Sequence, residues 1–249
     1  MYAKGGYSFY GQIIGILCLE TKSPRILGHI KNAFTFNFPV RYKVVKGATI
    51  KRVVKEADPN LLEPFIKAAK ELENEGVMAI TSSCGFLSLF QKELSENLNV
   101  PVFTSSLMQV PLVHQMLGKN KKIGIITAIK ECLTEKHLEA VGITPSIPIV
   151  ITGMQDKEEF YDVIIEEKKD ILDVEKLRKE VLEVAEGLVK MDPSVKAIVL
   201  ECTDLTPFTP DIQKSLNLPV FDIISLTNYV YNSLVRKYNA TCTFRSSLF

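Results

Sequence analysis

One repeated segment constrains the fold of this chain more than any other feature of its sequence. Residues 77–103 align without a gap with residues 195–221. The matched positions include Cys84 with Cys202, Leu87 with Leu205, Phe90 with Phe208, and Pro101-Val102-Phe103 with Pro219-Val220-Phe221. A repeat of this length predicts two copies of one half-molecule. Two halves related by pseudo-symmetry would place the two thiols opposite each other across a cleft.

Strand and helix signals alternate along both copies. Asp58, followed by Pro59, and Asp173 each begin an amphipathic helix, and each helix leads into a short apolar strand. The expected strands are 12–19, 77–81, 121–128 and 195–200. This alternation predicts an α/β fold with mostly parallel sheets. Ligands of such folds bind at the carboxyl ends of the strands, where both repeated cysteines lie.

Two further segments, one after the first strand and one at the end of the chain, complete the expected arrangement. Residues 20–48 are irregular and rich in aromatic residues, and we expect a long loop there of the kind that forms a lid or a site wall. Residues 229–237 are the expected last helix.

Composition excludes several classes of protein. The net charge is +1 with scattered Lys and Arg, so we expect neither a nucleic-acid partner nor a membrane surface. No apolar run reaches the ~18 residues of a membrane span, and residues 1–10 do not resemble a signal peptide. Five cysteines without a C-x-x-C pair favour reduced thiols and a cytoplasmic location. The three histidines lie far apart, and we expect no metal site.

Only two of the cysteines are candidates for chemistry. A single Cys is usually a small buried apolar residue, and we interpret Cys18, Cys132 and Cys242 in this way. Cys84 and Cys202 share one position of the repeat, lie at strand ends before helix starts, and have small polar neighbours. A pair of this kind favours function over packing.

The position of the pair suits proton transfer. A helix N-terminus favours the thiolate, and its free N–H groups can hold a carboxylate. A carboxylate substrate would place its α-carbon between the sulfurs, so that one thiolate removes a proton and the opposite thiol returns one. Ser82 and Ser83 are ligand candidates by position, unless their hydroxyls stabilise the turn. Asp204 either caps the turn or contacts the substrate or thiol.

The cysteine motifs resemble those of a known superfamily. Cys84 in I-T-S-S-C-G-F and Cys202 in V-L-E-C-T-D-L-T-P-F are similar to the two motifs of the cofactor-independent Asp/Glu/hydantoin racemases. The resemblance covers nearly the whole chain. It implies two similar α/β domains with the site in the cleft between them, formed by residues 1–103 with 221–249 and by residues 104–220. It also implies two catalytic thiols without pyridoxal phosphate or another cofactor, and a homodimer.

The same resemblance implies further site residues. Thr203, directly after the second cysteine, would hold the substrate carboxylate, and Thr127 is a second candidate for that role. Amino-acid racemases of the superfamily usually carry Cys-Asn-Thr at the first motif, whereas this chain has Gly85 after Cys84. Gly85 can offer only its backbone N–H. Glutamate-specific members carry an acidic residue after the first strand and a His after the second Cys-Thr. This chain has Leu17-Cys18-Leu19 and Asp204 there, so the substrate stays open.

Three hypotheses follow for the function. The leading one is an isomerase: a two-cysteine racemase or epimerase of an amino acid or a related small carboxylate. The second is a different reaction on the same scaffold, such as isomerisation or decarboxylation of a small dicarboxylate. The third is a non-catalytic protein that binds a small carboxylate, which would not need two thiols.

Overall fold

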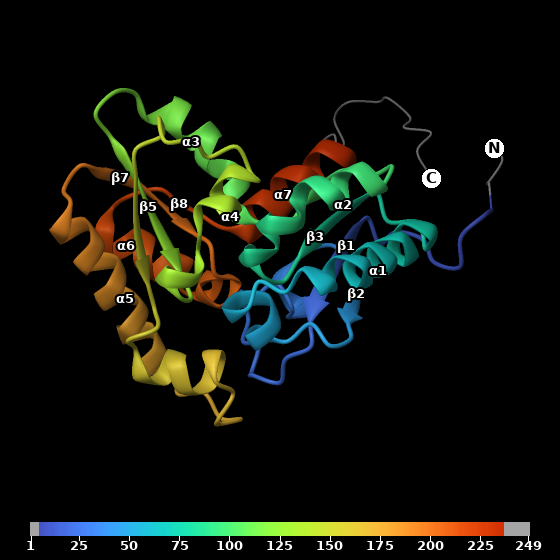
Figure 1. Cartoon of the computed structure of the whole chain (residues 1–249), viewed down its shortest axis with the longest axis horizontal. Helices are drawn as coiled ribbons and strands as arrows, with labels where there is room; N and C mark the ends of the chain where they lie inside the picture. Colours follow the sequence, from blue (N-terminus) through green and yellow to red (C-terminus); the bar gives the residue numbers. More distant parts are fainter. Residues whose placement is uncertain (1–4, 237–249) are drawn as a thin grey trace, which may run out of the picture.

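The computed structural model describes residues 5–236 and, within them, two parallel four-stranded sheets (Figure 1). The sheets have the orders β2-β1-β3-β4 and β6-β5-β7-β8, so each is the topological copy of the other. The strands are β1 (Ile14–Leu19), β2 (Val40–Val45), β3 (Ala79–Ser82), β4 (Val102–Phe103), β5 (Lys122–Thr127), β6 (Ile149–Gly153), β7 (Val195–Leu200) and β8 (Val220–Phe221). The predicted α/β class with two pseudo-symmetric parallel sheets is confirmed.

Helices flank both sheets. The α-helices are α1 (Leu62–Asn74), α2 (Gln91–Asn97), α3 (Val110–Leu117), α4 (Glu135–Glu139), α5 (Val174–Met191), α6 (Thr209–Leu216) and α7 (Ile223–Leu234). Tighter 3-10 turns are η1 (Ala33–Thr35), η3 (Pro59–Leu61), η4 (Gly85–Phe90), η5 (Ser106–Gln109), η6 (Lys130–Cys132) and η8 (Thr203–Phe208). Two π-helical turns are η2 (Lys51–Lys55) and η7 (Phe160–Ile165). The predicted caps are confirmed, because Asp58 accepts a hydrogen bond from Asn60 N–H and Asp173 accepts one from Lys176 N–H.

The segment 20–48 is not wholly a loop, and that prediction was wrong in part. Residues 40–45 form β2, which pairs in parallel with β1 along its whole length. Val40, Arg41, Tyr42 and Lys43 are only half-buried, because β2 is an edge strand. An edge strand of this kind lacks the continuous apolar run that revealed β1.

The last helix begins earlier than its sequence pattern indicated. Helix α7 starts at Ile223 and not at Tyr229, because Asp222 and Ser225 form a reciprocal capping box. The predicted end, Lys237, lies outside the described residues. The helix packs on the face of the first sheet, where Ile223 joins an apolar cluster with Ile14 and Ile16. The ring of Tyr231 on this helix stacks on Phe38 with centroids 3.6 Å apart.

The two halves share one apolar core. A continuous cluster of buried side chains includes Phe65 from the first half and Phe160 and Phe208 from the second. Each fully buried ring contributes about 2 kcal/mol through removal of apolar surface from water. A buried hydrogen bond of 2.7 Å from Thr203 Oγ1 to the Ser83 carbonyl also joins the halves. The strand ends that carry the cysteines are therefore held firmly against each other.

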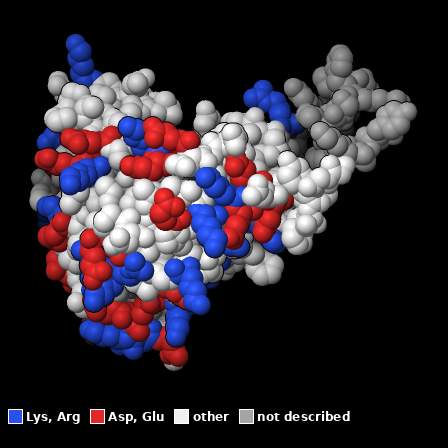
Figure 2. Space-filling view, turned by 45° about the vertical axis from the view of Figure 1, so that its right-hand side comes forward, with Lys and Arg blue, Asp and Glu red and all other residues white. Residues whose placement is uncertain are grey.

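The outer surface carries charge of both signs. Lys and Arg side chains are interspersed with Asp and Glu on the face shown in Figure 2. No helix within residues 5–236 has the length and apolar character needed to cross a lipid bilayer.

Candidate active site

The repeated cysteines occupy equivalent turns of the two halves. Cys84 follows β3 and is the N-cap of η4, and Cys202 follows β7 and is the N-cap of η8. The cysteine carbonyls accept hydrogen bonds from Leu87 N–H at 3.1 Å and from Leu205 N–H at 3.2 Å. Each cysteine is therefore held by the same local geometry at the carboxyl end of a central strand.

Both cysteines line one cavity between the halves. The cavity volume is about 40 Å³, which favours a compact ligand. Its walls are mostly apolar, and its polar groups lie around the two sulfurs. The lining residues are Leu19, Thr21, Arg25, Ile50, Val54, Ser83, Cys84, Gly85, Phe86, Ala128, Ile129, Ile164, Ile165, Glu201, Cys202, Thr203 and Asp204.

Both thiols are protonated in the protein without substrate. Burial raises the pKa of Cys84 and of Cys202 above the ordinary value of a thiol. The negative charges of Glu201 and Asp204 raise both values further. The backbone N–H groups of Phe86 and Asp204 act in the opposite direction on Cys84 and Cys202, respectively, but burial dominates. A cation in the cavity would lower both pKa values.

Asp204 connects Cys202 to a polar cluster. The thiol of Cys202 lies 3.8 Å from Asp204 Oδ2 and donates to it. The other oxygen, Oδ1, forms an ion pair with the Arg25 guanidinium, which is 13% exposed. His29 Nε2 lies 3.5 Å from the same oxygen, and burial lowers the pKa of His29 to about 3, so this ring is neutral. The segment after β1 thus contributes a cation to the turn of the second half.

A buried carboxyl group lies on the other side of the thiols. Glu201 Oε2 accepts a hydrogen bond of 2.6 Å from Thr127 Oγ1, whereas Oε1 has no hydrogen-bond partner among the described residues. Burial raises the pKa of Glu201 to about 7. A Cβ atom at Gly85 would overlap the carboxyl group and the carbonyl of Glu201. Gly85 therefore leaves the space that Glu201 occupies, which gives a physical reason for the absence of Asn after Cys84.

The remaining predicted residues divide into two groups. Ser83 and Thr203 line the cavity, and a 2.7 Å hydrogen bond from Thr203 Oγ1 to the Ser83 carbonyl ties the two turns together. Ser82 and Thr127 are fully buried outside the lining. Ser82 Oγ donates to the carbonyl oxygens of Thr104 and Cys84, at 2.6 and 2.9 Å. The hydroxyls of Ser82 and Thr127 therefore form hydrogen bonds within the protein and do not line the cavity.

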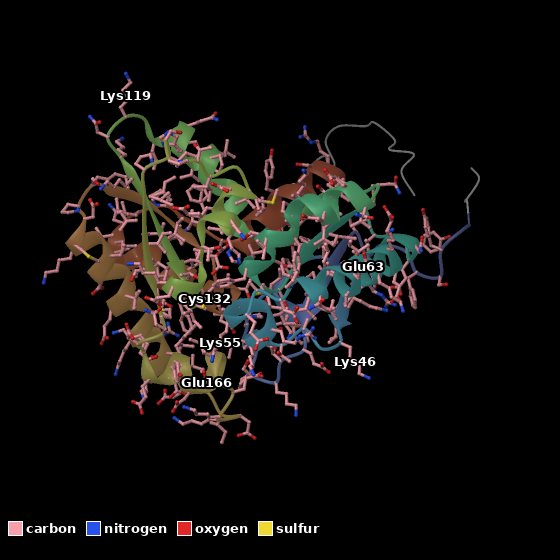
Figure 3. All side chains as sticks on the ribbon, viewed as in Figure 1. Lys46, Lys55, Glu63, Lys119, Cys132 and Glu166 are labelled. Atoms are coloured by element: carbon pink, nitrogen blue, oxygen red, sulfur yellow. The ribbon has the colours of Figure 1, made fainter. Side chains whose placement is uncertain are left out.

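Two π-helical turns close the apolar side of the cavity. Val54 extends from η2 and Ile50 is the N-cap of that turn, whereas Ile164 and Ile165 extend from η7. Figure 3 shows Lys55 and Glu166 pointing toward each other at the junction of these turns, where they form an ion pair. The ion pair between Lys55 and Glu166 thus joins the two halves at the surface, and the aliphatic side chains of η2 and η7 line the cavity beneath that pair.

Two charged residues of the cavity, Arg25 and Glu201, were not among the predicted site residues. Arg25 lies in the irregular segment 20–48, which has no counterpart in the repeat, so only the tertiary structure reveals it. Glu201 did carry a signal, because it is the one acidic residue in the apolar run before Cys202. The four cysteines within the described residues are free thiols, and Cys242 lies outside that range.

Solved structures identify the fold. The chain is similar to a mutant of arylmalonate decarboxylase in a sulfate-associated form, with a TM-score of 0.62, 13% identity, and coverage of 90% of this chain and 94% of the other. It is also similar to the aspartate racemase of Picrophilus torridus, with a TM-score of 0.59, 17% identity, and coverage of 90% and 94%. The two-half α/β fold is that of the Asp/Glu racemase superfamily, as predicted.

Similar sequences identify the family within this superfamily to which the chain belongs. A dimethylsulfoniopropionate lyase of Durusdinium sp. clade D is 31% identical over 228 residues, which are 89% of this chain and 75% of that protein. Dimethylsulfoniopropionate lyase 7 of Emiliania huxleyi is 32% identical over 224 residues, 86% of this chain and 65% of that protein. The chain therefore belongs to the dimethylsulfoniopropionate lyase family. It spans 60% of the length of lyases 3 and 6 of Emiliania huxleyi. No protein-family model matches it.

These relatives correct the leading functional hypothesis. The prediction of an isomerase, a racemase or epimerase of an amino acid, was wrong, because the relatives are named as lyases. The second hypothesis, another reaction on the same scaffold, agrees better with them. The cysteine motifs predicted the scaffold, and proton removal next to a carboxylate is common to racemisation and to elimination. The motifs do not determine whether the resulting electron pair is reprotonated or expels a leaving group.

Proposed function

We propose that the protein is a dimethylsulfoniopropionate lyase that cleaves its substrate by β-elimination. The substrate carries a carboxylate at one end and a dimethylsulfonium group at the other, with two carbons between them. The observation that carries the proposal is that both repeated thiols line one small apolar cavity. Relatives of this name at 31% identity over 89% of the chain support the choice of substrate.

The proposed reaction is a single proton abstraction with loss of a neutral leaving group. A thiolate takes the proton from the carbon next to the carboxylate. The electron pair of that C–H bond forms the C=C bond, and the C–S bond breaks with its pair on sulfur. The products are acrylate, dimethyl sulfide and a protonated thiol, which returns its proton to solvent. No electron is gained or lost overall, so the reaction needs no oxidant or reductant.

Cys202 is the better placed of the two thiols to act as the base. Its sulfur lies 3.8 Å from Asp204 Oδ2, which gives its proton an acceptor when the thiolate forms. Cys84 donates to no carboxylate among the described residues, whereas the pKa values of both thiols are raised by Glu201 and Asp204 alike. The sulfonium charge of a bound substrate would favour the thiolate of Cys202 at the moment it is needed.

The substrate carboxylate belongs on the polar side of the cavity. Arg25, Ser83 and Thr203 lie there, and Gly85 and Thr203 are the first residues of η4 and η8, where a helical turn leaves its N–H groups without intrahelical partners. Asp204 acts through Cys202 and Arg25. The aliphatic walls from η2 and η7 exclude water, which would otherwise solvate the thiolate and weaken it as a base.

The test is direct assay of the purified full chain with dimethylsulfoniopropionate. We expect equal amounts of dimethyl sulfide, measured in the headspace by gas chromatography, and acrylate, measured by NMR. Substrate deuterated next to the carboxylate should react more slowly, because that C–H bond breaks in the elimination. The Cys84→Ser/Cys202→Ser double variant is the control and should release no dimethyl sulfide. A folded wild-type protein that releases none either would overturn the proposal.

A further inference from the structure

Glu201 is a buried carboxyl group in a mostly aliphatic cavity, and no cation among the described residues forms an ion pair with it. Its side chain is fully buried, and Oε1 lacks a hydrogen-bond partner among residues 5–236. The nearest guanidinium in the lining, Arg25, is engaged by Asp204 and by a 2.8 Å hydrogen bond to Thr21 Oγ1. A buried carboxyl group with a free oxygen costs stability unless something binds it. The free carboxyl oxygen of Glu201 is therefore available to bind a cation in the cavity.

The rest of the wall restricts which cation fits. The side chains opposite the turns are aliphatic, from Ile50, Val54, Ile164 and Ile165. A primary ammonium ion has three N–H donors that these side chains could not satisfy. A sulfonium or quaternary ammonium group has no such donors and presents methyl groups to its surroundings. One carboxylate together with an aliphatic wall matches the charge and the methyl groups of an onium ion.

We propose that Glu201 recognises the onium end of the substrate, so that the site selects small carboxylates with a permanently charged, methylated cation. The inference rests on the proposed lyase function and assigns the residue that recognises the cation of its substrate. The equivalent position of the first half is Ser83, which is neutral. The substrate is consequently held in one orientation, with its cation toward Glu201 and its carboxylate toward Arg25. Glu201 is a specificity-determining residue in this proposal and takes no proton from the substrate.

The experiment compares two unreactive ligands by isothermal titration calorimetry. One is 3-(trimethylammonio)propanoate, an onium carboxylate, and the other is 4,4-dimethylpentanoate, which has the same shape with a neutral carbon in place of the charged nitrogen. Above pH 7, wild-type protein should bind the onium ligand at least about tenfold more tightly. Glu201→Gln, which keeps the size and removes the charge, should abolish this preference. Glu201→Asp, which keeps the charge, should retain part of it.

A matched control variant distinguishes the effect of a charge inside the cavity from the general effect of neutralising a buried carboxylate. Glu93 on α2 also has a buried oxygen, Oε2, without a hydrogen-bond partner among the described residues, but it lies outside the cavity lining. Glu93→Gln should leave the preference unchanged. Equal binding of the two ligands by wild type, or an unchanged preference in Glu201→Gln, would overturn the inference.

The wild-type protein provides a test that does not depend on any variant. Its preference for the onium ligand should fall as the pH is lowered through about 7, because Glu201 then gains a proton. The titratable groups facing Glu201 are the thiols of Cys84 and Cys202, whose raised pKa values keep them protonated in this range. Asp204 lies beyond them in its ion pair with Arg25. A preference that does not change with pH contradicts the assignment.

The outcomes separate this inference from the proposed function. Preference for the onium ligand without release of dimethyl sulfide would retain the inference and reject the lyase activity. Release of dimethyl sulfide by a protein that binds both ligands equally would retain the lyase activity and reject the inference about Glu201. If Glu201→Gln lost kcat while keeping its preference for the onium ligand, the residue would belong to proton transfer and not to recognition.

Discussion

The turns after β3 and β7 share a backbone geometry but differ in chemistry. Both begin with a cysteine that caps a 3-10 helix and sits at the end of a central parallel strand. The aligned neighbours are Ser83 with Glu201, Gly85 with Thr203, and Phe86 with Asp204. The first turn is therefore neutral and partly apolar, whereas the second carries two carboxyl groups.

This difference indicates what kind of reaction the scaffold serves. Racemisation removes and returns protons on two faces of one carbon, which needs two thiols of similar competence. Elimination needs one base and a place for a leaving group, so the two turns are free to diverge. Among the cysteines of residues 5–236, only Cys202 has a carboxylate acceptor, Asp204, within reach of its thiol proton. The asymmetry of the pair agrees with the lyase relatives better than with the racemases that share the fold.

Replacing each cysteine separately should have the largest effect, and it tests directly whether the turns after β3 and β7 differ in function. We expect Cys202→Ser to lower kcat for dimethylsulfoniopropionate by about 10³-fold, because a serine hydroxyl is a far weaker base than a thiolate. Cys84→Ser should lower it by a smaller factor. Steady-state assays of dimethyl sulfide release measure both, with circular dichroism to verify folding. Equal losses would mean that the two thiols act as equals, as in a racemase.

Neutralising Glu201 should change how stability depends on pH. The pKa of Glu201 is raised from 4.5 to about 7, so between these values the unfolded chain ionises while the folded protein keeps the proton. Wild-type stability should therefore fall as the pH rises through this window. Glu201→Gln cannot titrate, and its stability relative to wild type should increase by about 3 kcal/mol across the window. Urea unfolding below pH 4.5 and above pH 7 measures the change, and parallel pH curves would refute it.

A methyl group at position 85 should show that Gly85 and Glu201 depend on each other. Gly85→Ala places a Cβ against the carboxyl group and carbonyl of Glu201, and we expect a loss of about 2 kcal/mol in unfolding free energy. In a Glu201→Ser background the loss should be smaller, because only the carbonyl remains in the way. Gly187→Ala on α5 is the control. Its Cβ meets nothing within 4 Å, so chemical denaturation should show no loss.

The ion pair across the cavity wall should have the smallest effect. Lys55→Gln removes the pair with Glu166, whose side chain is 27% exposed, and exposed pairs contribute at most about 1 kcal/mol. We expect a change in KM of no more than about fivefold, toward weaker binding, as the two π-helical turns separate more readily. Lys51→Gln, which disturbs an ion pair within the first half alone, should leave KM unchanged. Equal effects of the two variants would show that the contact between halves is unimportant.

The parts of the fold that the sequence predicted are those with a strong local pattern. The central strands β1 and β5 are continuous apolar runs, and the caps of the helices before β3 and β7 follow from Asp58 and Asp173. The edge strand β2 was missed because its side chains are half-buried and include charged residues. The start of α7 was missed because its signal was the capping box at Asp222, not the apolar pattern.

The candidate site was predictable only where the repeat points to it. The alignment brought Cys84 and Cys202 to attention, and the structure places both in one cavity. Glu201 was visible in the same alignment opposite Ser83, but its importance depends on Thr127 and Gly85, which approach it only in three dimensions. Arg25 reaches the cavity from a segment without a repeat partner, so no local pattern could reveal it.

Helix α7 has a consequence for the order in which the molecule is completed. Its residues follow β8 of the second half in the chain, yet they cover Ile14 and Ile16 of the first sheet. A ribosome releases the chain from its N-terminus, so this face of the first sheet, on which Phe36 and Phe38 also pack, lacks its helix until the whole second half has been synthesised. The half that is made first is therefore finished last, and the second half can form its own sheet while the first still waits for its final helix.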